Sequence, residues 1–148
     1  MREKLRDDLK TAMKARDARL TSTLRLMLAA VQERDNAAPG GKIPDEEILP
    51  VLNKMVRQRK ESLETYEKAG RDDLAKIERE EIAIIEHYLP KQMSEADARE
   101  AIAALIKEVG AAGPKDMGKV MGALKAKFAG QMDMGKANGV VKELLTPK

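Results

Sequence analysis

Lysine and glycine in the last third of the chain are the residues whose types and spacing indicate a binding surface. From Ala111 onward there are seven lysines against three acidic residues, and six of the ten glycines lie there too. Ammonium groups contact phosphate oxygens without reading base sequence, so clustered lysines would bind a nucleic-acid backbone. An ordinary solubilising surface is the alternative that composition leaves open. Six of these lysines lie on two expected helices and their connection: Lys115, Lys119, Lys125, Lys127, Lys136 and Lys142.

Small residues recur at every fourth position, at Gly118, Gly122, Ala126 and Gly130. On a helix this spacing places them in one narrow stripe. Close packing against a neighbouring helix is the interpretation that we favour. The second interpretation is a bare backbone that admits a phosphate or a ribose, and both can hold at different ends of the stripe.

Residue types that support catalysis or tight metal binding are scarce. The chain has no cysteine and only one histidine, His87, which excludes thiolate sites, cysteine nucleophiles and multi-histidine metal sites. No serine lies in a Gly-x-Ser-x-Gly context. We expect His87 to be partly exposed near a helix end, and the acidic residues from Glu78 to Glu86 to form a solvated face. We therefore predict no catalytic residues, no metal and no cofactor.

The elements that must position these residues are helices, because apolar residues recur at intervals of three and four and no stretch alternates as a strand does. Asp45 and Ser94 are typical N-caps, and Gly70 and Gly110 typical helix ends. A proline ends the fourth helix at Leu89–Pro90. We expect helices within residues 5–13, 20–31, 45–69, 72–89, 94–109, 117–128 and 140–145, with a break near 15–17 and a loop over 36–44.

Composition divides the chain into two parts. Residues 1–90 carry 18 basic and 18 acidic side chains, whereas residues 91–148 carry 10 and 7. We predict an all-α protein with an N-terminal four-helix unit over 1–90 and a small three-helix tail domain over 91–148. The tail is near the lower size limit for independent folding. We expect no internal repeat.

A basic run on the expected third helix contains Lys54, Arg57, Arg59 and Lys60. Acidic residues at helical spacing, Glu61 and Glu64, neutralise much of this charge, so we interpret the run as a solvated face.

Neither a membrane span nor a secretion signal is evident. The longest apolar run, Leu26–Val31, has six residues, which is far too short to cross a bilayer. No apolar signal core follows the N-terminal residues. We therefore expect a cytoplasmic protein without a membrane partner.

Several short motifs, in this order, resemble the GatB/YqeY family over essentially the whole chain. They are Lys54–Lys60, Gly70–Leu74, Tyr88–Gln92 and Lys115–Gly122. The last third is also similar to the tail domain of the GatB component of the glutamine-dependent tRNA amidotransferase, most clearly at Gly135–Asn138 and Val141–Leu145.

The resemblance implies an N-terminal helical bundle and a small tail that, in the amidotransferase, helps to hold tRNA near its elbow. Catalysis there belongs to other domains, which nothing in this sequence matches. The tail positions that match the motif are Gly118, Met121, Gly122, Gly130, Gly135, Lys136 and Asn138. The sequence departs at residues 130–134, where relatives are expected to have a more basic, glycine-rich turn.

We accordingly predict a non-catalytic adaptor that binds tRNA or another structured RNA through its tail. One alternative is an accessory component of glutamine-dependent carbon–nitrogen ligation, working with amidotransferase subunits or an aminoacyl-tRNA synthetase. Another is a helical protein-interaction module. The predicted RNA-binding residues are Lys115, Gly118, Lys119, Gly122, Lys125, Lys127, Gly130, Gly135, Lys136 and Asn138.

Overall fold

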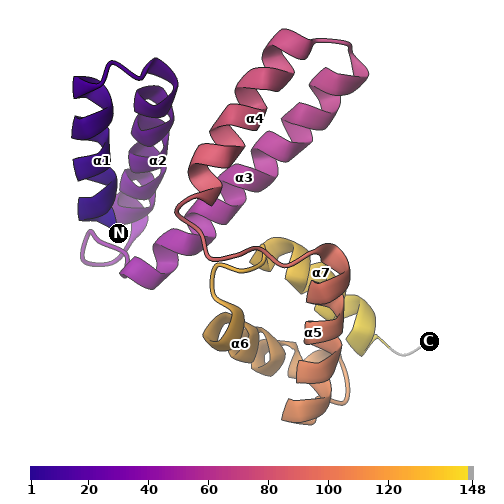
Figure 1. Cartoon of the computed structure of the whole chain (residues 1–148). Coiled ribbons are helices and arrows are strands. Elements are labelled where there is room, and N and C mark those ends of the chain that lie inside the picture. The colour runs from indigo at the N-terminus through magenta and orange to yellow at the C-terminus, as the bar shows by residue number, and fades with distance from the viewer. Residues whose placement is uncertain (147–148) are drawn as a thin grey trace. The chain divides into compact units, whose positions relative to one another are not determined.

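The structure, a computed structural model, describes residues 1–146, and every regular element within them is a helix (Figure 1). The prediction of an all-α protein is therefore confirmed. The chain forms two compact units, the first from Met1 to Leu89 and the second from Pro90 onward. Within residues 1–146, no helix has both the length and the apolar character that a membrane span requires.

The N-terminal unit consists of two helical hairpins. The first pairs α1 (Arg2–Lys14) with α2 (Ala18–Ala37), and the second pairs α3 (Asp45–Lys68) with α4 (Asp72–Glu86). The hairpins meet where α2 packs against α3 and α4, and the α3–α4 hairpin extends beyond this contact (Figure 1). Fully buried leucines and isoleucines from all four helices form one core, including Leu5, Leu24, Leu52 and Ile85.

A buried ion pair joins the start of α1 to the end of α2. The Arg2 guanidinium donates to both carboxylate oxygens of Asp35 and to the Ile43 carbonyl, and the Ile43 N–H donates back to Asp35 at 2.8 Å. The hydrogen bond from Arg2, followed by the one from the Ile43 amide, lowers the pKa of the Asp35 carboxyl below its usual value. Because each charged group is satisfied, this pair fixes how the loop after α2 returns to α1.

Two predicted helix ends differ from the structure. Asp45 is not an N-cap: Pro44 occupies that position, and the Asp45 carboxylate instead lies near the Met1 amine and Arg2. Helix α4 ends at Glu86 rather than at Leu89–Pro90, because Tyr88 leaves the helix to donate a hydrogen bond to Asp8 on α1. The predicted break near residues 15–17 is present, and Asp17 caps α2 by accepting the Leu20 N–H.

Glu78 corrects the expectation that all acidic residues of α4 form a solvated face. It follows Ala75 and precedes Ile82 at the spacing of the buried stripe, and its Oε2 is shielded from solvent without a hydrogen-bond partner. Burial, and then the negative charge of Glu81, raise the pKa of the Glu78 carboxyl above its usual value, against an opposing effect of Arg59. The proton is therefore held more tightly in the folded chain than in the unfolded one.

The substitution Glu78→Gln tests this assignment. A carboxyl whose pKa is raised by folding stabilises the fold while it is protonated and loses that contribution as pH rises from its unfolded value of 4.5 through its folded value. We expect Glu78→Gln to be more stable than the wild type above this window, with the difference vanishing below it. Urea unfolding midpoints across the window measure this, with Glu61→Gln on the exposed side of α3 as the control that changes nothing.

The second unit is a three-helix tail. It contains α5 (Glu95–Val109), one turn of 3-10 helix (Pro114–Asp116), α6 (Met117–Phe128) and α7 (Met134–Leu145). Ser94 caps α5 by accepting the Asp97 N–H, and Gly110 ends it at φ 69°, as predicted. Each helix packs against the other two around a core that includes Ile102, Val120, Leu124 and Val141.

Candidate nucleic-acid interface

The two helices that carry most of the predicted residues are copies of one sequence pattern, so the expectation of no internal repeat is wrong. The pattern Asp-Met-Gly-Lys-x-x-Gly-x-x-Lys occupies residues 116–125 and again 133–142. In both copies the aspartate is the N-cap residue of a helix of 12 residues, α6 or α7. Because the register is the same, corresponding residues lie on the same face of their own helix.

The two aspartates at N-cap positions are held differently, and only Asp133 caps its helix. Asp133 accepts the backbone N–H groups of Gly135 at 2.7 Å and Lys136 at 3.3 Å, which gives two N–H groups of the first turn of α7 a partner. Asp116 instead accepts the Ala112 N–H at 2.9 Å. This hydrogen bond, reinforced by the charges of Lys115 and Lys119, lowers the pKa of the Asp116 carboxyl below its usual value. A carboxylate is therefore present beside two of the predicted lysines.

The glycines of α6 lie on its exposed side, which overturns the packing interpretation of the small-residue stripe. A Cβ atom added at Gly118 or Gly122 would meet nothing within 4 Å. The helix packs through Val120 and Leu124 instead, both completely buried. Gly139 on α7 is equally open, and Gly135 and Asn138 are exposed beside it.

Gly130 lies apart from this exposed side. Helix α6 ends at Phe128, so Gly130 does not continue the stripe, and it is buried with φ 76°. Its carbonyl accepts a hydrogen bond from the Gln92 side chain at 2.7 Å, and the neighbouring Gln131 carbonyl accepts the Met93 N–H. In the structure, Gly130 thus connects the turn between α6 and α7 to the segment before α5.

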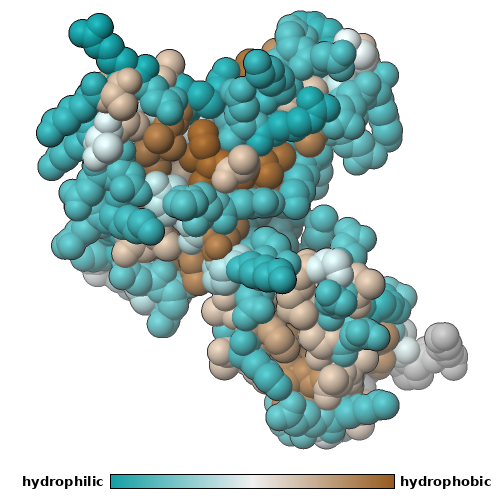
Figure 2. All heavy atoms as spheres, in the orientation of Figure 1, coloured by the Kyte–Doolittle hydropathy of each residue, from teal (hydrophilic) through white to brown (hydrophobic). Residues whose placement is uncertain are grey.

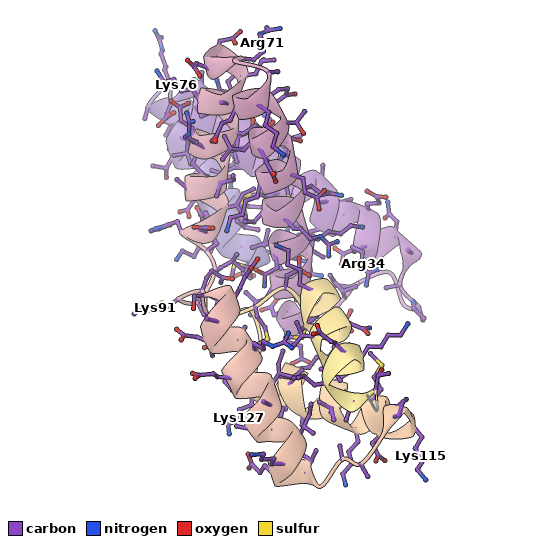
Figure 3. All side chains as sticks on the ribbon, turned by 90° about the vertical axis from the view of Figure 1, so that its right-hand side faces the viewer. Arg34, Arg71, Lys76, Lys91, Lys115 and Lys127 are labelled. Carbon is purple, nitrogen blue, oxygen red and sulfur yellow. The ribbon has the colours of Figure 1, made fainter. Side chains whose placement is uncertain are left out.

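The predicted lysines do not form a single patch. Lys127 lies 3.5 Å from Glu108, and Lys136 lies 3.8 Å from Glu95, so each is paired with a carboxylate of α5. Figure 3 places Lys115 and Lys127 on opposite sides of the tail. Exposed ion pairs of this kind contribute little, about 0–1 kcal/mol, so a phosphate can compete for either lysine.

Two faces remain in which glycine and lysine lie together. We define the α6 face as Gly118, Lys119, Gly122 and Lys125, all exposed. The α7 face consists of Gly135, Lys136, Gly139 and Lys142, also exposed. Within residues 1–146, neither Lys125 nor Lys142 makes an ion pair.

Two members of the α7 face are missing from the predicted RNA-binding residues: Gly139, which the sequence did not single out, and Lys142, which was counted only among the tail lysines. Aligning residues 133–142 with 116–125 would have found them. Lys148, the last of the seven lysines, lies outside the described residues.

These features define the class of the protein: an all-helical chain of two units, the smaller of which presents a duplicated glycine- and lysine-bearing helix face. The family follows from comparison with known proteins. The model of the YqeY-like protein family matches residues 2–145, and the chain belongs to this family.

Three of the curated relatives come from yeasts. The chain is 32% identical over 112 residues to a protein of Lachancea thermotolerans, which covers 74% of this chain and 60% of the relative. It is 34% identical over 107 residues to one of Clavispora lusitaniae, with 71% and 62% covered. A third, from Vanderwaltozyma polyspora, is 35% identical over 85 residues, with 57% and 46% covered. The chain thus spans about half to three-fifths of these relatives, each named altered inheritance of mitochondria protein 41, mitochondrial.

Their names correct the predicted compartment. The relatives are mitochondrial proteins by name, which contradicts the cytoplasm that we expected. The physical reason for the error is that a missing apolar core argues only against a secretory signal, whereas mitochondrial targeting segments are amphipathic and rich in arginine and serine.

Proposed function

We propose that the tail binds structured RNA, with tRNA as the expected class, through the α6 face and its copy on α7. The observation that carries the proposal is the open space around Gly118 and Gly122 beside Lys119 and Lys125. A glycine inside a helix costs about 1 kcal/mol relative to alanine, and no packing contact offsets that cost here. A phosphate backbone that approaches the bare helix, while the lysines contact its oxygens, supplies a physical reason for glycine at these positions.

Filter binding of an unmodified tRNA transcript to the full chain tests the proposal. If about four lysines contact phosphates, the logarithm of the binding constant falls with that of the salt concentration with a slope of about −3 to −4. Affinity then drops by about 100-fold between about 50 and 200 mM salt. Absence of binding at micromolar protein, or binding that ignores salt, would show that the tail does not hold RNA in this way.

The substitution Gly122→Ala separates stability from binding. We expect it to stabilise the tail by about 0.5–1 kcal/mol, because α6 gains helix propensity and the new methyl group meets no neighbour. The same methyl group stands between the backbone and the RNA, so tRNA affinity should fall. Urea unfolding and filter binding measure the two effects.

A matched control for this substitution lies on α5. Ala104 is exposed and belongs to neither face, so Ala104→Gly should destabilise the tail by a similar amount and leave tRNA affinity unchanged. If Gly122→Ala binds tRNA as well as the wild type does, close approach of an RNA backbone does not explain the glycine at this position.

A further inference from the structure

A groove between α1 and α2 in the N-terminal unit lies apart from the residues of the tail. Its volume is about 290 Å³. It is lined by Arg2 and Arg6 from α1 and by Leu28, Ala29, Val31, Gln32 and Asp35 from α2. The proposed RNA-binding function uses none of these residues.

The groove carries positive charge that no carboxylate neutralises. Arg2 and Asp35 neutralise each other at its floor, whereas Arg6 makes no ion pair with any described residue. Lys10 follows Arg6 by one helical turn and Arg25 precedes Ala29 by one turn, so both extend the lined surface on the same sides of their helices.

Lys10 and Arg25, the two cations that flank the groove lining, also lack a carboxylate partner among the described residues. Lys10 is exposed and makes no ion pair among the residues described, and the only hydrogen bond of the Arg25 guanidinium there is to the Met13 sulfur at 3.9 Å. Gln32 and Asn36, at the other end of the groove, hydrogen-bond to each other and carry no charge. Three cations therefore border the groove without an acidic partner among residues 1–146.

Apart from Gln32, the remaining lining is apolar, which decides the kind of ligand. Leu28, Ala29 and Val31 contribute hydrocarbon to the groove, and the Met13 side chain next to Arg25 is 49% exposed. Figure 2 shows the hydrophobic residues of the chain in brown against the hydrophilic ones in teal. Phosphate and ribose have no hydrocarbon surface that could cover this apolar lining. A ligand with both carboxylates and hydrocarbon can pair with the three cations and cover the apolar lining at the same time.

We propose that the α1–α2 groove docks an acidic amphipathic helix of a partner protein. Its apolar side lies on Leu28 and Met13, and its carboxylates pair with Arg6, Lys10 and Arg25. The stretch of α2 from Arg25 to Asn36 is about 18 Å long, which matches about three turns of a docked helix. This is the helix-in-groove mode of recognition, in which the positive charge of the groove requires a negatively charged partner helix.

A display selection with the full chain as bait tests the proposal. The probe is a library of peptides about four helical turns long with leucine fixed at helical spacing, whose other positions vary among Glu, Lys, Gln, Ser and Ala. We expect the enriched peptides to be glutamate-rich opposite the leucines. Their affinity, measured by fluorescence anisotropy, should fall by about tenfold or more for the double variant Arg6→Glu/Arg25→Glu.

The control variant is Arg34→Glu/Lys76→Glu, which makes the same change in net charge. Both residues are exposed on the N-terminal unit, lie outside the groove lining and are shown in Figure 3. If Arg6→Glu/Arg25→Glu does not fold, Arg6→Gln/Arg25→Gln replaces it, with the same direction expected. The proposal is overturned if no acidic peptide is enriched, or if both double variants bind the selected peptides equally.

Binding of tRNA to the same variants distinguishes this surface from the proposed RNA interface. The docking proposal expects Arg6→Gln/Arg25→Gln to weaken peptide binding and leave tRNA affinity unchanged. A loss of tRNA affinity equal to the loss of peptide affinity would identify the groove as a nucleic-acid surface and overturn the assignment. Failure of the chain to bind any tRNA removes the function proposed for the tail without affecting this result.

Discussion

Replacing Lys119 and Lys125 together by glutamate is expected to lower the affinity of the chain for tRNA by about 10- to 100-fold at low salt. The two lysines belong to the α6 face and make no ion pair within residues 1–146, although the charge of Lys119 helps to lower the pKa of the Asp116 carboxyl. Each lost phosphate contact should also reduce the steepness of the salt dependence by about 1. The measurement is the slope of affinity against salt, together with the affinity itself.

The matched control is Lys91→Glu/Lys107→Glu, which changes net charge equally within the same unit. Both residues are exposed and lie outside α6 and α7. A general electrostatic attraction between a basic chain and RNA would weaken by the same factor in the two double variants. Equal losses would therefore contradict a local interface on α6.

The copy of the pattern on α7 gives this experiment a second comparison. Lys136→Glu/Lys142→Glu alters the corresponding positions, but Lys136 already lies 3.8 Å from Glu95. Reversing Lys136 places two carboxylates close together, whereas reversing Lys142 disturbs no pair among the described residues. We expect the α7 variant to lose tRNA affinity as well, together with a modest loss of tail stability.

Helix identity was predictable here because the signals are local. Ser94 and Gly110 act through neighbours within one turn of the helix ends, and both behave as the sequence indicates. Asp45 does not cap α3, because its carboxylate accepts a hydrogen bond from Arg2, which lies 43 positions away in the sequence. Similarly, Tyr88 leaves α4 because its hydroxyl reaches Asp8, a partner 80 positions away. Such distant partners are not encoded in helical spacing.

Charge pairing shows the same division between local and tertiary effects. The expected partners of the basic run on α3 were Glu61 and Glu64, at helical spacing. Arg59 instead pairs with Glu81 at 2.7 Å and Lys60 with Glu86 at 3.3 Å, both on α4. Glu64 pairs with Lys68. Arg59 and Lys60 thus pair across the α3–α4 hairpin rather than along α3. The spacing of charges along one helix does not show which residues of a neighbouring helix lie opposite.

The candidate site was predictable in composition but not in geometry. The sequence indicates that lysine and glycine gather in the tail, and the repeat at 116–125 and 133–142 was available to an alignment of the chain with itself. Pairing of Lys127 with Glu108 depends instead on how α5 packs against α6. The exposed position of Gly122 depends on which side of α6 faces the core. Both are properties of packing.

Truncating Leu124 to alanine is expected to destabilise the tail by about 2–5 kcal/mol and leave the N-terminal unit folded. Leu124 is completely buried in the tail core, and a unit of this size has little stability to lose. Because the contacts cluster into two units, we expect the tail to unfold without unfolding of residues 1–89. Amide hydrogen exchange should therefore show loss of protection confined to residues after Pro90, accompanied by loss of tRNA binding.

The same chemical change in the other core completes this experiment. Leu24 is also completely buried, but it belongs to the core of α1–α4, so Leu24→Ala should reduce protection in the N-terminal unit and spare the tail. Because the RNA contacts are assigned to α6 and α7, Leu24→Ala should retain tRNA binding at a temperature where Leu124→Ala has lost it. If either substitution lowers protection equally in both units, the chain unfolds as one cooperative body. Binding data from the two variants would then no longer assign the RNA interface to the tail.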